Sequence, residues 1–307
     1  MAPLHLRLFG PLRAHCSETG SETVFSGRTA ELLAYLGLFR SRRHARVRLA
    51  GVLWGDLTDR KARRCLSTTL WRLRSDLEVM LPAGAAVFHA GRHEVAFHPG
   101  TAVQLDVAAF EEATLPVAAG TPPATLEAAA AVERSLALYE ADLLDGMFHD
   151  WVLRERRRLR GLRLSAFVAL MRFHKERAEL GDAIRWGQEL LVAEPYNEAI
   201  VREMMRLHVT AGQRGLALEL YERTTHVLEE ELEEGPTDET RSLYARIRGG
   251  AAPRVHEPPA PPLSGLVRRL RTAARDLEAA RSHVRRAVEE MEHGSNPRWP
   301  PRPGGPA

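Results

Sequence analysis

Basic, hydroxyl and aromatic side chains share one face of the segment from Asp59 to Met80. In this segment Leu66, Leu70, Leu73 and Leu77 follow one another at spacings of four, three and four residues, which predicts an amphipathic helix with a buried leucine stripe. Guanidinium groups bind guanine edges and phosphates, and hydroxyls hydrogen-bond to the nucleic-acid backbone, so such a face suits the major groove of DNA. The candidate residues on the outer face and its flanks are Arg60, Lys61, Arg63, Arg64, Thr68, Trp71, Arg72 and Ser75.

The expected contact differs with position on this face. Arg64 and Thr68 lie nearly opposite the leucine stripe, so Arg64 is the candidate for a guanine edge and Thr68 for a thymine methyl group or a phosphate. Arg63 and Arg72 lie toward the flanks, where phosphate contact is expected. Trp71 has two interpretations, packing on a sugar or packing against the protein's own sheet. An ordinary solvated surface helix would show the same pattern. The neighbouring segments therefore decide between a surface helix and a DNA-binding helix.

The segments around this helix predict a winged helix-turn-helix with a small N-terminal sheet. Leu4, Leu6 and Leu8 alternate with polar residues before a Gly-Pro turn, which predicts a strand. Arg92 and His93 fall at the tip of a predicted hairpin, the wing, from which they can enter a neighbouring minor groove. Further strands are expected at 12–16 and 23–25, helices at 28–40 and 49–54, and the hairpin at 86–98.

From Leu105 onward helical periodicity replaces strand patterns, with helices expected at 125–141 and 151–180. A repeat with an offset of 34 residues relates the Gly181 segment to the Gly215 segment, and His174 to His208. This is the tetratricopeptide period, in which small residues are expected where paired helices cross, and such helix pairs build concave surfaces for partners. The fold class is therefore mainly α with a small β part.

Charge is distributed unevenly along the chain. Residues 1–107 carry a net charge of +6, residues 108–250 carry −7 and residues 251–307 carry +4. A basic first part joined to an acidic middle predicts two partners, of which one is polyanionic.

Other classes of chemistry find little support. His89, His93 and His98 are spaced by four and five residues on strands, which scatters the rings, so we expect no metal site there. Nucleophile, metalloprotease and dinucleotide motifs are absent from the sequence, so we expect no catalysis and no cofactor. No apolar run is long enough to span a membrane and two cysteines form no framework, which favours a cytoplasmic protein.

The order of these parts resembles the Streptomyces antibiotic regulatory protein family. The resemblance rests on WGDLTDRKARRCLSTTLWRLRSDL, on QLDVAAFEEA, on WVLRERRRL and on GPTDETRSLYARI, and covers roughly residues 4–248. It implies an OmpR-type winged helix joined to a tetratricopeptide-like bacterial transcriptional activation domain. It also implies activation of biosynthetic or other gene clusters, through direct repeats near promoters and contact with RNA polymerase.

The chain departs from that family at two points. Glu234-Gly235-Pro236 replaces the more usual Gly-x-Glu-Pro. Neither lysine follows a glycine, so the nucleotide-binding domain of larger members has no phosphate loop here. The alternative function is a protein-binding scaffold whose winged helix no longer binds DNA.

The expected organisation has a DNA-binding domain at 1–105 and an activation domain at 106–250. A proline-rich linker is expected at 251–262, an amphipathic helix at 263–293 and a disordered tail at 294–307. The 263–293 segment has leucine, valine and methionine at one heptad position and mostly alanine at the other, which makes a homodimer a hypothesis.

Overall fold

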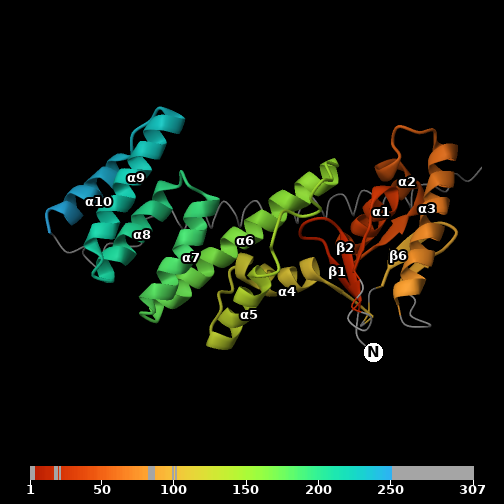
Figure 1. Cartoon of the computed structure of the whole chain (residues 1–307), viewed down its shortest axis with the longest axis horizontal. Coiled ribbons are helices and arrows are strands. Elements are labelled where there is room, and N and C mark those ends of the chain that lie inside the picture. Colours follow the sequence, from red (N-terminus) through yellow and green to blue (C-terminus); the bar gives the residue numbers. More distant parts are fainter. Residues whose placement is uncertain are drawn as a thin grey trace, which may run out of the picture. The chain divides into compact units, whose positions relative to one another are not determined.

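A computed structural model describes residues 4–16, 20, 22–81, 87–98, 100 and 102–250 (Figure 1). Within these residues the fold is mainly helical, with small N-terminal sheets consistent with a winged helix, followed by a helical region. The linker, helix and tail expected after residue 250 lie outside the described residues. No helix of the described part is long and apolar enough to cross a bilayer.

The first sheet has the strand order β3-β2-β1-β7. Its strands are β1 (Leu4–Arg7), β2 (Arg13–Cys16), β3 (Glu22–Val24) and β7 (Val103–Leu105). Leu4 and Leu6 are buried, as the alternation predicts. β7 pairs with β1 in parallel, with Leu6 opposite Leu105. β7 was not predicted, and the helix expected from Leu105 begins at Asp106, because a strand of three residues leaves no periodicity to recognise.

The helix-turn-helix consists of α1 (Gly27–Leu38), α2 (Arg46–Leu53) and α3 (Asp59–Met80). A second sheet, of order β4-β6-β5, lies beside them and contains β4 (Arg43–Ala45), β5 (Phe88–Ala90) and β6 (Glu94–Phe97). β4 was not predicted, and the expected start of the second helix at Leu49 was wrong. That helix begins three residues earlier, because the chain leaves β4 at Ala45 and the N–H of Arg46 donates to the His93 carbonyl at 2.8 Å.

The helical region contains antiparallel pairs of neighbouring helices (Figure 1). Its helices are α4 (Asp106–Ala118), α5 (Leu126–Leu136), α6 (Asp150–Glu176), α7 (Leu180–Ala193), α8 (Glu198–Thr210), α9 (Arg214–Leu232) and α10 (Asp238–Arg248). The expected ends at 141 and 180 were wrong. α5 stops at Leu136 because the chain turns to bring Leu143 back against Phe9. α6 stops at Glu176, before Ala178 adopts a left-handed φ of 59°.

The 34-residue repeat recurs in the backbone. Glu179 N–H donates to the His174 carbonyl at 2.9 Å, and Gln213 N–H donates to the His208 carbonyl at 2.8 Å. Both bonds close the turn between the helices of a pair. The expectation that Gly181 and Gly215 lie where paired helices cross was wrong, because a Cβ at either position would meet nothing within 4 Å.

The small residues at the helix crossings lie deeper in the repeats. Ala183 and Ala217, which are related by the same offset, are fully buried. A Cβ at Gly187 would lie 2.0 Å from Sδ of Met204, so this glycine marks the close approach of α7 and α8.

Asp106 joins the first sheet to the helical region. Its Oδ2 accepts hydrogen bonds from the N–H groups of Leu8 and Phe9 at 2.8 and 2.9 Å, and its Oδ1 accepts from Val107 at 2.6 Å. Burial raises the pKa of Asp106 to about 6, although the three donors act in the opposite direction. The Leu143 segment continues this connection, since it bridges to Phe9 and Gly10.

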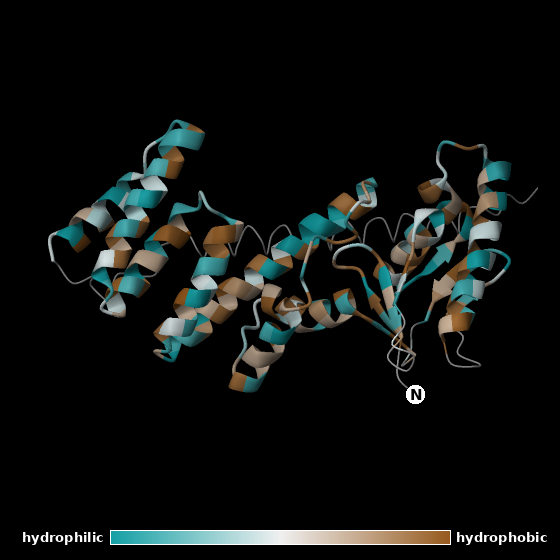
Figure 2. Cartoon of the chain, in the orientation of Figure 1, coloured by the Kyte–Doolittle hydropathy of each residue, from teal (hydrophilic) through white to brown (hydrophobic). Residues whose placement is uncertain are grey.

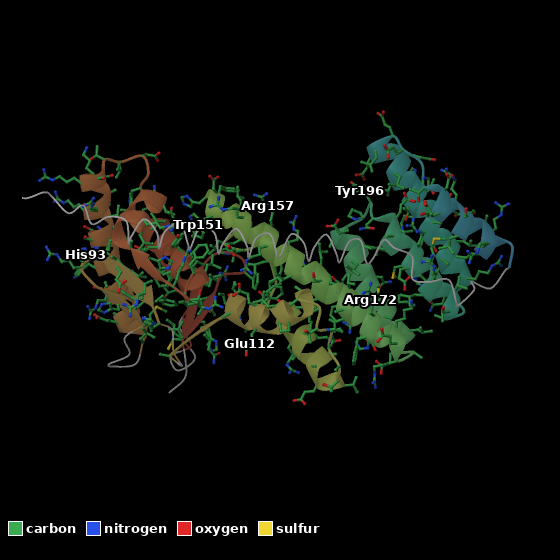
Figure 3. The ribbon with its side chains drawn as sticks, turned by 180° about the vertical axis from the view of Figure 1, so that it is seen from behind. His93, Glu112, Trp151, Arg157, Arg172 and Tyr196 are labelled. Atoms are coloured by element: carbon green, nitrogen blue, oxygen red, sulfur yellow. The ribbon has the colours of Figure 1, made fainter. Side chains whose placement is uncertain are left out.

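Trp151, at the start of α6, forms a second connection. Its ring meets Tyr35 of α1 edge-on at 5.2 Å and stacks with His149 at 5.9 Å. His149 Nε2 lies 3.2 Å from a carboxylate oxygen of Glu31. Figure 3 shows Trp151 where α6 reaches the N-terminal elements. These contacts pack α6 against α1 through aromatic surface together with the polar contact between His149 and Glu31.

Candidate nucleic-acid interface

α3 is held by the leucine stripe that its sequence predicts. Leu66, Leu70, Leu73 and Leu77 are all buried, against α1 and α2. Asp59 in the first turn carries the negative charge that favours a helix N-terminus. Hydrophobic and hydrophilic colours alternate along this helix in Figure 2. The buried stripe therefore fixes which face α3 turns to solvent.

A turn of five residues, 54–58, sets α3 against α2. Trp54 ends α2, with its N–H donating to the Ala50 carbonyl at 2.9 Å, and Leu57 N–H donates to the Trp54 carbonyl at 3.0 Å. Glycine is favoured at position 55, because a Cβ there would lie 3.0 Å from the carbonyl oxygen of Gly51, a tight contact.

The outer face of α3 is strongly cationic. Arg63 is paired with Asp59 at 3.8 Å, but both side chains are largely exposed. Arg60, Lys61, Arg64 and Arg72 have no ion pair among the described residues. Of the candidate residues on α3, the exposed ones are Arg60, Lys61, Arg63, Arg64, Thr68, Trp71 and Arg72, whereas Ser75 is half-buried.

Trp71 and Thr68 present apolar surface within this cationic face. Trp71 is 68% exposed, so the alternative in which it packs against the protein's own sheet is wrong. Thr68 Oγ1 donates to the Arg64 carbonyl at 3.2 Å. Because its proton is used within the helix, Thr68 offers its methyl group and a lone pair outward.

The wing places two of the predicted residues at its tip. β5 and β6 pair with Ala90 opposite Val95, and Gly91 N–H donates to the Glu94 carbonyl at 2.8 Å. Arg92 and His93 are both exposed in the turn between the strands. Figure 3 shows His93 at the outer edge of the view. Among the described residues no group of three or more His, Cys, Asp and Glu could hold a metal ion.

His44 anchors the other edge of the wing sheet. It lies in β4 opposite Val95, is 3% exposed, and its Nε2 lies 3.1 Å from the Phe39 carbonyl. Burial, reinforced by the nearby guanidinium groups of Arg42 and Arg48, lowers the pKa of His44 to about 4. His44 is therefore neutral at physiological pH, and Nε2 can donate to the carbonyl.

Sequence reasoning overlooked the basic residues beside the wing. Arg43 forms an ion pair with Glu94, Arg46 is half-buried between α3 and the wing, and Arg48 is exposed on α2. The signal was present, because five arginines lie between residues 40 and 48. Their spacing alone does not indicate a role, because the unpredicted strand β4 is what brings them next to the hairpin.

Comparisons with known proteins agree with this arrangement. The family model of the bacterial transcriptional activator domain matches residues 105–248, which confirms the helical domain that the resemblance implied. No curated protein matches the chain. The structure is similar to that of Mycobacterium tuberculosis EmbR in complex with a low-affinity phosphopeptide, with a TM-score of 0.63 and 18% sequence identity.

That likeness covers 92% of this chain and 72% of the EmbR chain, and at this identity it concerns the fold. It includes the N-terminal elements that the family model leaves out, since that model begins at residue 105. Residues 105–248 therefore match the bacterial transcriptional activator domain, and in the fold this helical region follows N-terminal sheets and helices that are consistent with a winged helix.

Proposed function

We propose that the protein binds promoter DNA through α3 and the wing, and activates transcription by recruiting RNA polymerase through its helical region. The observation that carries the proposal is the outer face of α3, where Arg60, Lys61, Arg64 and Arg72 are exposed and have no ion pair among the described residues. Cations without a protein partner are available to replace the counterions of DNA phosphates.

Arg64 and Arg72 have different roles in this proposal. Arg64 lies nearly opposite the buried stripe, in the N-terminal half of α3, where a bidentate contact with guanine gives about 1–3 kcal/mol of discrimination. Thr68 Oγ1 already donates to the Arg64 carbonyl, which favours contact with a thymine methyl group over donation to a phosphate. Arg72 and Arg63 contact phosphates on the flanks, and Trp71 packs on a sugar.

The wing contributes the second contact. Arg92 and His93 lie at the exposed turn, so they enter the minor groove next to the major groove that α3 occupies. A narrow, A·T-rich minor groove attracts arginine through its negative potential. Sites of this kind are expected in pairs as direct repeats, with two copies of the chain side by side.

A binding experiment tests the DNA contacts. A duplex enriched from a random library and a scrambled duplex are titrated at two salt concentrations, with binding followed by fluorescence anisotropy. Arg64→Ala should lose affinity mainly for the enriched duplex. Arg72→Ala should weaken both duplexes alike and reduce the salt slope by about 1. Arg74→Ala is the matched control, because Arg74 lies on the same helix but its charge is paired with Glu78 at 2.7 Å.

Two results would refute the DNA proposal. If Arg64→Ala loses affinity equally on both duplexes, Arg64 is a phosphate contact and does not read bases. If the wild-type chain shows no salt-dependent binding, the alternative of a protein-binding scaffold replaces the proposal.

Recruitment of RNA polymerase rests on the helical region. Residues 108–250 carry a net charge of −7, which disfavours direct contact with DNA, and stacked helix pairs offer surfaces for peptide-sized or helical partners. The regulated genes are proposed to be a biosynthetic cluster, and the chain to act in the cytoplasm on nucleoid DNA.

The recruitment test uses the full chain with Arg64→Ala and Arg72→Ala combined, so that DNA cannot bridge the two proteins. This variant should still retain RNA polymerase holoenzyme on an affinity column after nuclease treatment. A chain that retains no polymerase subunit, and instead gains thermal stability from a small molecule, would be a sensor.

A further inference from the structure

Arg46, the first residue of α2, links α2 to α3 and to the tip of the wing through hydrogen bonds. Its Nη1 donates to the Gly91 carbonyl at 3.4 Å, and its Nη2 donates to Ser67 Oγ at 2.8 Å. Its own N–H donates to the His93 carbonyl at 2.8 Å. Arg92, which we propose to enter the minor groove, stands between the two carbonyls that Arg46 holds.

The connection continues into α3. Ser67 Oγ donates its proton to the Arg63 carbonyl at 3.0 Å, one turn earlier, so its lone pairs remain available to accept from Arg46. Arg63 and Arg64 belong to the cationic face of α3. A planar guanidinium offers several N–H donors in fixed directions, so one arginine can hold a wing carbonyl and a helix hydroxyl at a set separation.

Without the Arg46 side chain, the wing tip would keep the backbone bond from Arg46 N–H to the His93 carbonyl, but it would lose its connection to α3 through Ser67. β5 and β6 are short strands, and an isolated hairpin of this kind is marginally stable in water. β4 supports β6 as far as Glu94, but the turn beyond Glu94 has no strand beside it among the described residues. The bonds from Arg46 reach this turn.

We propose that Arg46 is a positioning residue, which fixes the wing tip relative to α3 so that one DNA site is read in two adjacent grooves at once. This inference rests on the proposed function of α3 and the wing. The Arg46 side chain acts through Gly91 and Ser67, since the bond to His93 comes from the backbone, and it adds no base contact of its own. Its loss should therefore remove the contribution of Arg92 and leave that of Arg64 intact.

The test is a set of double-mutant cycles on the full chain, with the duplex enriched from a random library as the probe. In the wild-type background, Arg92→Ala should weaken binding by about tenfold, as expected for one lost charge-assisted hydrogen bond. In the Arg46→Met background the same change should have almost no effect. Arg64→Ala is the matched control and should cause the same fold loss in both backgrounds.

Ser67→Ala is a second variant, which removes the acceptor on α3 without touching the wing. It should reduce the effect of Arg92→Ala, and it should add little to Arg46→Met because both changes break the same connection. Thermal melts of each variant show whether the fold is kept.

The outcomes separate three cases. An unchanged tenfold effect of Arg92→Ala in the Arg46→Met background refutes the inference alone. A loss of the Arg64 contribution as well shows a general collapse of the domain, and also refutes it. A wild-type chain that does not bind the duplex refutes the proposed function and this inference with it.

Discussion

Replacing Ala178 by glycine should stabilise the protein. Ala178 has a φ of 59°, in the left-handed region, and Gly212 holds the equivalent place in the next repeat with a φ of 75°. A side chain with a Cβ pays about 1–2 kcal/mol for this conformation. Glycine loses more chain entropy on folding, by about 0.5–1 kcal/mol. The difference predicts a gain of about 0.5–1 kcal/mol for Ala178→Gly.

Gly212→Ala is the reciprocal variant. A Cβ at Gly212 would meet nothing within 4 Å, so its effect isolates the backbone strain. We expect a loss of about 0.5–1 kcal/mol, and a shift in Tm of about 1–4 °C in opposite directions for the two variants. Urea denaturation followed by circular dichroism measures both, and the slope with denaturant should not change. If Ala178→Gly lowers the urea midpoint, or Gly212→Ala leaves it unchanged, backbone strain at these turns does not determine the stability difference.

Three further variants test packing and protonation. His44 resists protonation in the folded state and accepts a proton in the unfolded state below about pH 6.5, so the free energy of unfolding should fall by about 2 kcal/mol between about pH 7.5 and 5. Urea melts of His44→Gln should show a smaller fall over the same pH range. A fall as large as in the wild type would show that His44 does not cause this pH dependence. Gly187→Ala should lower the free energy of unfolding by about 1–3 kcal/mol because its Cβ would overlap Met204, whereas Gly181→Ala, in the same helix, should be neutral or stabilising. Equal melting temperatures for the two variants would count against close packing at Gly187. Trp151→Ala should lower the free energy of unfolding by about 3–5 kcal/mol, since the indole is buried against α1, and a loss below about 1 kcal/mol would show that this contact is dispensable.

The sequence predicted α3 from its first to its last residue, because its leucine stripe is long, regular and local. The wing was predicted for a similar reason, since two short strands flank a turn within a few residues. The 34-residue repeat was visible because equivalent turns use equivalent residues, such as His174 and His208.

The remaining features depend on partners that are distant in the sequence. β4 and β7 have three residues each and exist because β6 and β1 offer them an edge. Arg46 lies beside the wing because β4, which ends at Ala45, pairs with β6. The spacing of residues around Arg46 therefore does not indicate its position. Gly181 and Gly187 look alike as small residues in one helix, and only the path of α8 shows that the second one is at the crossing.

The parallel pairing of β1 with β7 affects how the protein is made. The N–H groups of Leu8 and Phe9 are bound by Asp106, 98 and 97 residues later in the chain. At roughly 5–20 residues per second, a ribosome adds Asp106 about 5–20 s after Leu8. The first strand to be synthesised must therefore wait with one edge unpaired, and an exposed edge is where chains associate wrongly. Slower translation of the codons for α1 to α3 should lengthen that wait and lower the yield of soluble protein.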